Sequence, residues 1–282
     1  MRPQVPHAKK LLVIGHRWPE PEATAAGSRM MGMLEGFLKE GYHITFASAA
    51  VPGLYGTFAS AAVPGLYGIP LEPLGIQTER ISLNDSAFNE FLKSNPFEIV
   101  LFDRFMTEEQ FGWRVRECLP DSTLVLDTED LHSLRQSREK AIRQDRAWNV
   151  ESWMTHPHFY REIASILRCD LSLLVSAAER DLLKSHLPIL EGKIFYLPFQ
   201  MKPATEGDPV GFQQRSGFVF LGTGMHRPNL DAIEQLKNRI WPLLSRRLPQ
   251  AVLRLYGAYR PGQILGFHNP PDRFEVCGWA PS

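Results

Sequence analysis

The sequence predicts an α/β fold with parallel sheets, arranged in two doubly wound units of which the second is incomplete. Three observations lead to this prediction. Short apolar runs of strand length recur along the chain and alternate with segments of helical periodicity. The length of 282 residues is enough for two domains of about 150 residues each. A polar stretch rich in proline and glycine, at 201–216, separates a long first series of strands from a short second one.

The composition is that of an ordinary soluble globular protein, with 44% hydrophobic and 22% charged residues. The 31 basic residues balance the 31 acidic ones, so no net field favours nucleic acid, and we expect no nucleic-acid partner. Cys118, Cys169 and Cys277 are far apart and form no CxxC pair, which indicates a reducing compartment. The apolar run Leu11–Ile14 is too short for a signal peptide or a membrane span. We therefore expect a cytoplasmic protein, and peripheral contact with a membrane stays open.

Residues 1–200 are predicted to form the first domain, in which strands alternate with helices. The expected strands are Leu11–Gly15, His43–Ser48, Glu79–Leu83, Phe97–Asp103, Thr123–Asp127, Leu171–Ser176 and Lys193–Pro198. The expected helices run to about Glu40, over 85–94, from Thr107 to about Cys118, over 131–148, over 157–168, and from Ser176 to about His186. Thr107 and Ser176 are predicted helix starts because each precedes a glutamine or glutamate by three positions, which is capping-box spacing.

A direct duplication interrupts this pattern, because the segment Thr45–Gly56 is repeated without a gap at Thr57–Gly68. Solenoid repeats have periods of about 20 residues or more, so the repeat indicates an in-frame duplication and no repeat architecture. Only one copy can occupy the second strand. We therefore expect 45–68 to contain an added surface loop that is poorly ordered between 50 and 68.

Residues 217–282 are predicted to begin a second domain, with a new alternation of strands and helix. Its expected strands are Phe218–Gly222, Ala251–Gly257 and Phe274–Trp279. A helix between the first two is predicted by the apolar spacing of Leu230, Ile233, Leu236 and Ile240. Three strands with one clear helix are about half of a domain, so we expect an incomplete sheet with an exposed apolar edge.

The stretch that follows the predicted strand Thr123–Asp127 is the strongest candidate site. Ligands of open α/β sheets bind beyond the carboxyl ends of the strands, where this sequence has Asp127, Glu129, Asp130 and His132. Asp130 is close enough in sequence for its carboxylate to orient the His132 imidazole as a general base. In the structural alternative, Asp130 caps the next helix and His132 lies on its surface. The sequence leaves both interpretations open.

Two glycine-bearing loops are candidate anion sites, because each leads into a predicted helix whose first N–H groups can bind a phosphate. The residues concerned are Gly27, Ser28 and Arg29 in the first loop and Gly222, Arg227 and Asn229 in the second. Neither loop matches the glycine fingerprint of dinucleotide-binding folds, which argues against NAD. For each loop the alternative is structural, with glycine serving only a tight turn or close packing.

No metal site is expected. His156 and His158 flank a proline and lack a third ligand nearby, and no DxD motif ends a predicted strand. The GxSxG and Walker A motifs are absent, which weakens hydrolase and P-loop interpretations.

The order and spacing of these motifs resemble group 1 glycosyltransferases with the two-domain GT-B fold. In the first domain the segments that resemble them are Leu11–Ser48, Val100–Glu117, Leu124–Arg135, Cys169–Leu183 and Lys193–Pro198. In the second domain they are Phe218–Gly257 and Val276–Ser282. The resemblance covers nearly the whole chain outside the duplication. It implies two Rossmann-like domains, with the acceptor bound mainly to the first and the donor mainly to the second.

The resemblance also implies a function, which is transfer of a sugar from a nucleotide-diphosphate sugar to a glycan or small-molecule acceptor. Members of the family that retain configuration need no metal or other cofactor. In the family the donor domain continues beyond the part matched here and carries a pair of glutamates that hold the donor. We therefore expect an incomplete donor site in 217–282. The alternative is a non-catalytic protein that binds a glycan or another partner.

The site residues that the resemblance implies coincide with the candidates above. His132 or Asp130 corresponds to the acceptor-side residue near the transferred sugar, so both are catalytic candidates. The candidates for donor binding are Gly27, Ser28 and Arg29 near the diphosphate, and Gly222, Arg227 and Asn229 in the first loop of the donor domain. Cations and helix N-termini at a leaving diphosphate would stabilise the charge that develops there.

Overall fold

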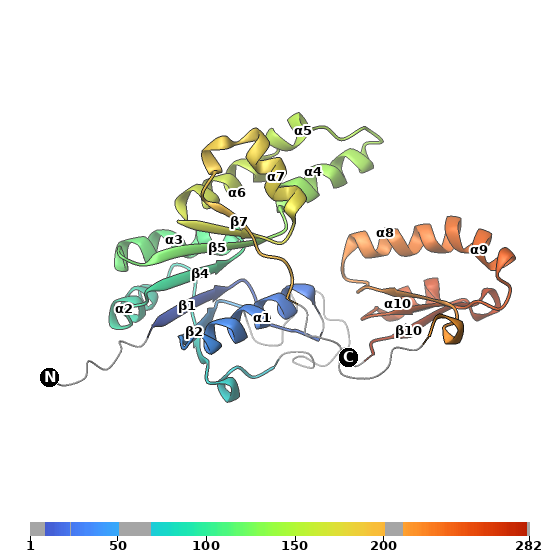
Figure 1. Ribbon diagram of the computed structural model, residues 1–282, viewed down its shortest axis with the longest axis horizontal. Coiled ribbons are helices and arrows are strands. Elements are labelled where there is room, and N and C mark those ends of the chain that lie inside the picture. Colours follow the sequence, from blue (N-terminus) through green and yellow to red (C-terminus); the bar gives the residue numbers. More distant parts are fainter. Residues whose placement is uncertain (1–8, 23, 51–68, 201–210, 281–282) are drawn as a thin grey trace. The chain divides into compact units, whose positions relative to one another are not determined.

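The structure is a computed structural model that describes residues 9–22, 24–50, 69–200 and 211–280 (Figure 1). The chain divides into two compact units, of which the first holds most residues up to Gln200 and the second consists mainly of Met201–Ser282. No helix within the described ranges is both long and apolar enough to cross a lipid bilayer.

The first unit is built on a seven-stranded parallel sheet in the order β3-β2-β1-β4-β5-β6-β7. The strands are β1 (Lys10–Gly15), β2 (His43–Ser48), β3 (Gln77–Arg80), β4 (Ile99–Asp103), β5 (Thr123–Glu129), β6 (Leu171–Leu174) and β7 (Ile194–Tyr196). The chain runs outward from β1 to β3 and then returns to place β4 on the other side of β1. The order therefore reverses between β1 and β4, which is the topological switch point of the sheet.

Helices pack against both faces of this sheet. They are α1 (Ala25–Lys39), α2 (Ala87–Ser94), α3 (Phe105–Cys118), α4 (His132–Arg143), α5 (Val150–Met154), α6 (Pro157–Arg168) and α7 (Ala177–His186). Alternate residues of β1 enter opposite cores, because side chains along a strand point to opposite faces. Leu11 packs in one core with Met30 and Leu34 of α1, and Leu12 packs in the other with Phe88 and Phe111.

The sequence placed some helices and one strand incorrectly. The helix predicted to start at Thr107 begins at Phe105, and the Thr107 hydroxyl donates inside the first turn to the carbonyl oxygen of Asp103 at 2.8 Å. The helix predicted over 131–148 ends at Arg143, and α5 follows as a separate helix whose N-cap is Asn149. Strand β3 was predicted to begin at Glu79 and begins at Gln77.

The first copy of the duplicated segment supplies the second strand, because Thr45–Ser48 of β2 pairs in register with both β1 and β3. The predicted loop over 50–68, with the second copy, lies outside the described residues apart from Ala50. The strand that contains the start of the first copy and the strand after the duplication are thus neighbours in the sheet, and Thr45 pairs with Gln77.

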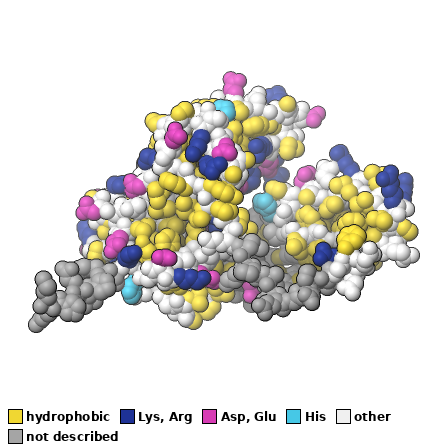
Figure 2. All heavy atoms as spheres, viewed as in Figure 1, with side chains coloured by type: hydrophobic (Ala, Val, Ile, Leu, Met, Phe, Trp, Pro, Cys, Tyr) yellow, Lys and Arg dark blue, Asp and Glu magenta, His cyan; other side chains and the backbone are white. Residues whose placement is uncertain are grey.

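The second unit contains a three-stranded parallel sheet in the order β10-β9-β8. Its elements are β8 (Phe218–Leu221), α8 (Arg227–Gln235), α9 (Trp241–Arg247), β9 (Leu253–Tyr256), α10 (Pro261–Phe267) and β10 (Phe274–Gly278). Helix α10 was not predicted. At β8, an edge strand of this sheet, the side chains of Val219 and Leu221 are 62% and 75% exposed. Figure 2 shows hydrophobic side chains gathered on the surface of this unit.

Candidate functional site

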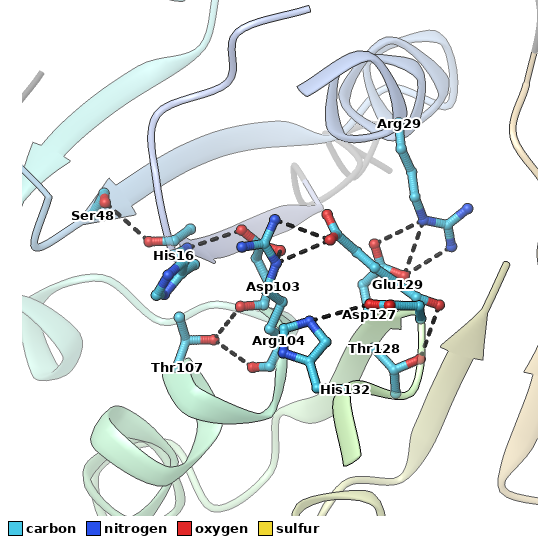
Figure 3. A network of polar contacts seen from close by, with 12 residues as sticks. His16, Arg29, Ser48, Asp103, Arg104, Thr107, Asp127, Thr128, Glu129 and His132 are labelled. Atoms are coloured by element: carbon cyan, nitrogen blue, oxygen red, sulfur yellow. Dashed lines mark hydrogen bonds and ion pairs between the residues drawn. The ribbon is translucent and has the colours of Figure 1, made fainter. Parts of the chain in front are cut away.

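Polar side chains gather at the carboxyl ends of β1, β4 and β5, around the switch point of the first sheet (Figure 3). We call this group the switch-point cluster. Its members are His16, Asp103, Arg104, Asp127, Glu129, Asp130 and His132. A doubly wound sheet leaves a crevice at such a point, so the cluster lies where the fold can bind a ligand.

Asp103 joins β4 to the loop that follows β1. Its carboxylate oxygen Oδ2 accepts from the backbone N–H of His16 at 3.0 Å. Oδ1 lies 3.6 Å from Nε of Arg104, and among the described residues it has no hydrogen-bond partner. Burial raises the pKa of Asp103, because the charged form is poorly solvated there.

Arg104 and Glu129 form an ion pair across β4 and β5. Both Nε and Nη2 of Arg104 contact Oε2 of Glu129, at 3.0 and 2.9 Å. Both residues have positive φ, 72° for Arg104 and 58° for Glu129, which is uncommon for residues other than glycine. A register shift between Asp127 and Glu129 accompanies this conformation. Burial raises the pKa of Glu129 to about 7, although the charge of Arg104 acts in the opposite direction.

Asp127 of the cluster forms a second ion pair, with Arg29 of α1. Nε and Nη2 of Arg29 contact Oδ1 of Asp127 at 3.1 and 2.8 Å, and Nε also lies 2.9 Å from Oδ2. The two side chains are only 2% and 1% exposed, and Nη1 of Arg29 donates to the carbonyl oxygen of Leu197 at 2.6 Å. The arginine expected to bind the donor therefore has a buried side chain that is ion-paired within the protein.

Asp130 and His132 are in contact, with Oδ1 of the carboxylate 3.3 Å from Nε2 of the imidazole. Two details of the structural alternative differ in the structure, because the N-cap of α4 is Leu131 and the His132 side chain is only 12% exposed. Burial lowers the pKa of His132 to about 4, even though the Asp130 charge raises it. The imidazole is therefore neutral near pH 7 and can accept a hydrogen bond or a proton.

Every carboxylate of the cluster is paired with an arginine, which limits the chemistry that the cluster offers. The ion pairs join Asp127 to Arg29, Asp103 and Glu129 to Arg104, and Asp130 to Arg135. Within the described parts of the chain, no three His, Cys, Asp or Glu side chains are grouped so that they could hold a metal ion. Neutral imidazole and paired carboxylates suit hydrogen bonding to hydroxyl groups and proton transfer.

Three members of the cluster, His16, Asp103 and Arg104, were not predicted from the sequence. The signal was available, because each of them follows or ends a predicted strand, as Asp130 and His132 do. The backbone conformation of Arg104 had no such signal, since arginine rarely adopts positive φ.

The structure places the two glycine-bearing loops in different units. In the first unit, α1 begins at Ala25 and the Ser28 hydroxyl donates to the carbonyl oxygen of Pro21 at 2.6 Å. A Cβ on Gly27 would lie 2.4 Å from the carbonyl oxygen of Glu20, so glycine is needed for this close approach.

In the second unit, the loop after β8 uses much of its hydrogen-bonding capacity internally. The backbone N–H groups of Gly222 and Gly224 donate to the carbonyl oxygens of Tyr256 and Ala258, at 3.0 and 2.8 Å. Asn229 donates through Nδ2 to the carbonyl oxygen of Thr223 at 3.1 Å. Arg227 is the first residue of α8, so its charge lies at that helix N-terminus.

Replacing Gly27 with alanine is expected to destabilise the protein by about 1–3 kcal/mol, because the new methyl group would overlap the backbone of Glu20. Gly36 provides the matched control in the same helix, since a Cβ there would meet no atom within 4 Å. Gly36→Ala should stabilise the protein by up to about 1 kcal/mol through helix propensity. Thermal unfolding of both variants tests this, and equal effects would contradict the packing role of Gly27.

The stability of the first unit should depend on pH through its buried histidines. Burial lowers the pKa of His16 and of His132 from 6.5 to about 4, so the unfolded chain binds more protons between these values. Their contribution is complete above pH 6.5 and is lost as the pH falls towards 4. Glu129 and Glu162, with pKa values raised from 4.5 to about 7, act in the opposite sense over pH 4.5–7.

A His132→Gln variant isolates one of these contributions. Between roughly pH 7 and pH 5, the wild type should lose about 1–2 kcal/mol more of its free energy of unfolding than the variant, after allowance for solvent screening. Urea titrations at the two pH values measure the difference. An equal loss in both proteins would show that His132 titrates normally in the folded state.

Comparison with known proteins identifies the fold. No protein-family model matches the chain, and no curated protein matches it. Among solved structures, sucrose-phosphate synthase from Thermosynechococcus elongatus has a TM-score of 0.60 at 14% identity, over 97% of this chain and 71% of that one. The chain has a GT-B-like fold. This finding confirms the fold class predicted from the sequence.

Two further structures show that this GT-B-like fold occurs with different activities. A putative UDP-N-acetylglucosamine 2-epimerase from Listeria monocytogenes has a TM-score of 0.53 at 14% identity, over 98% of this chain and 69% of that one. The catalytic domain of starch synthase IV from Arabidopsis thaliana, bound to ADP and acarbose, has a TM-score of 0.50 at 11% identity, over 98% and 74%. At these identities the similarity establishes the fold alone.

Proposed function

We propose that this GT-B-like protein is a glycosyltransferase that transfers a sugar from a nucleotide-diphosphate sugar to a hydroxyl group of an acceptor. The observation that carries the proposal is the contact between Asp130 and His132, 3.3 Å apart at the carboxyl edge of the sheet. Two of the similar structures, sucrose-phosphate synthase and starch synthase, are named as enzymes that build sugars. The resemblance of the sequence favours retention of configuration without a metal.

In this proposal the imidazole of His132 contacts the reacting sugar, and the Asp130 carboxylate orients that imidazole. With Nε2 directed at the carboxylate oxygen, the neutral imidazole carries its proton on Nε2 and keeps Nδ1 as an acceptor. Nδ1 can then accept a hydrogen bond from a sugar hydroxyl near the reacting carbon. Arg104, whose charge lowers the pKa of His132, helps to keep the ring in this neutral form.

Each of the two candidate loops is proposed, separately, to bind the donor diphosphate at a helix N-terminus. The first turn of α1, at Gly27 and Ser28, and the start of α8, at Arg227, each present the positive end of a helix. Gly222 and Asn229 shape the loop that leads into α8. A diphosphate leaving group gains negative charge as the sugar bond breaks, so these groups would stabilise the transition state more than the ground state.

Incubation of the purified 282-residue chain with nucleotide sugars tests the proposal. UDP-glucose and ADP-glucose are offered separately, each with a panel of monosaccharide, sugar phosphate and glycan acceptors. A glycosyltransferase releases the nucleoside diphosphate faster when its acceptor is present, and the product carries a new glycosidic bond. If nucleotide or glycan binds but no donor turns over, the non-catalytic alternative is favoured.

Nucleotide-sugar epimerisation is a second candidate, favoured by the TM-score of 0.53 to the putative Listeria epimerase. The two activities differ in a direct observable. In deuterated water, 2-epimerisation of UDP-N-acetylglucosamine would exchange the hydrogen at C2 with solvent, whereas glycosyl transfer leaves that hydrogen in place. Deuterium at C2 of the recovered sugar would therefore decide for the epimerase.

A further inference from the structure

A carboxylate from another helix holds the first turn of α4, the helix that begins at His132. Glu162, on α6, is only 1% exposed, and its Oε1 accepts from the backbone N–H of His132 at 2.9 Å. Its Oε2 accepts from the backbone N–H of Ser133 at 3.2 Å and from the Ser133 hydroxyl at 2.5 Å. The N-cap residue Leu131 has no side-chain oxygen, so Glu162 does the work of an N-cap.

The same turn is tied to two more helices. Trp153 of α5 is fully buried, and its indole N–H donates to the Ser133 hydroxyl at 2.8 Å. Glu179 of α7 accepts from the backbone N–H of Leu131 at 3.0 Å. The backbone on either side of the His132 side chain is therefore fixed by groups from α5, α6 and α7.

This arrangement exceeds what the helix itself requires. A serine or aspartate at position 131 would cap α4 locally and at the surface of the turn. The chain instead buries a carboxylate, which is costly unless all its hydrogen bonds are made. Burial raises the pKa of Glu162 to about 7, in spite of the hydrogen bonds that favour its charged form. Such a cost is retained where the position of a group matters.

We propose that Glu162 is the positioning residue of His132. By holding the backbone N–H of His132, it sets the imidazole at its distance of 3.3 Å from Asp130 and keeps the ring buried. Glu162 itself contacts no reacting group, and its role in catalysis rests on the proposed function of His132. The placement of the ring can be measured independently of that function.

Glutamine is the informative replacement, because it preserves the shape of Glu162 but has one acceptor oxygen and an amide that is itself a donor. In Glu162→Gln, at least one N–H of the first turn would face another donor, so the turn should open and expose His132. Glu108→Gln is the matched control. Glu108 is also a buried glutamate, 2% exposed, but it pairs with Arg168 and makes no contact with α4 in the described contacts.

NMR titration of the histidine rings in the full-length chain is the test. Since burial is the main reason for the low pKa of His132, opening the turn should raise this pKa from about 4 towards 6.5, by about 1 unit or more. Ser133→Ala, which removes one of the hydrogen bonds to Glu162, should give a smaller rise. Glu108→Gln should leave the pKa of His132 unchanged.

The outcomes separate positioning from simple stabilisation. If Glu162→Gln and Ser133→Ala both lower the thermal midpoint yet leave the pKa of His132 at its wild-type value, the proposal is overturned. If Glu162→Gln does not fold, the Ser133→Ala titration decides alone. Should the chain transfer sugar, a lower kcat with an unchanged KM for the donor adds support. Should it transfer none, the proposed function fails, while the titration still decides the role of Glu162.

Discussion

Replacing Asp127 with asparagine is expected to lower the free energy of unfolding by about 3–5 kcal/mol. Asp127 and Arg29 are 1% and 2% exposed, so the loss of the carboxylate charge leaves a guanidinium buried without its counter-ion. The asparagine amide would also direct a donor at one of the N–H groups of Arg29. Urea denaturation at neutral pH, followed by circular dichroism, measures the effect.

The loss of stability in Asp127→Asn measures the cost of leaving Arg29 without its partner. A double variant measures what the intact ion pair contributes to stability. Arg29→Met combined with Asp127→Leu removes both charges and should recover most of the lost stability, since apolar packing often replaces a buried ion pair without cost. The exposed pair Arg143–Glu139 is the control, and Glu139→Gln should cost less than about 1 kcal/mol. A similar small loss in Asp127→Asn would contradict the structural role assigned to Arg29.

Replacing His132 with alanine is expected to reduce sugar transfer by about 10²–10⁴-fold, the usual contribution of a group that accepts or holds a proton in the transition state. The side chain is replaced by a methyl group, so Asp130 keeps its contact with Arg135 but loses the imidazole. Initial rates with the donor and acceptor identified in the turnover assay measure the loss. Circular dichroism checks that the fold is retained.

His43→Ala serves as the control for this experiment. His43 is exposed at the amino end of β2, the opposite end from the switch-point cluster. The His43→Ala variant should therefore transfer sugar at the wild-type rate. Unchanged transfer by the His132 variant would remove His132 from the mechanism. An equal loss in both variants would point to a general defect of the preparations.

The sequence predicted the sheet better than the helix boundaries. Strands such as β1 and β5 are short apolar runs buried on both faces. Such a run can be recognised from the few consecutive residues that form it. The start of α3 was missed because the backbone of Arg104 turns at positive φ, so that Thr107 bonds inside the helix. Tertiary geometry at β4 and β5 set that boundary, and local capping preference did not.

The candidate site was predictable in its position but only partly in its partners. The contact between Asp130 and His132 links residues that are neighbours in sequence, and it was expected. The pair Arg29–Asp127 joins residues 98 positions apart, so the sequence did not show it. Arg29 was instead grouped with its neighbour Gly27 in a predicted phosphate-binding loop. Glu162 reaches His132 across 30 positions and from another helix. No local pattern carries such pairings, because they depend on how the helices pack.

The backbone conformation of Arg104 bears on which substitutions this position accepts. At φ 72° and ψ 156°, Arg104 occupies a region that is nearly restricted to glycine, at a cost on the order of 1–3 kcal/mol. Arg104→Gly would relieve this strain but would leave the buried Glu129 carboxylate without its counter-ion, so we expect it to destabilise the protein. The natural chain keeps arginine there, ion-paired to a glutamate that also has positive φ. The strained backbone of Arg104 thus places its guanidinium against the Glu129 carboxylate, 2.9 Å away.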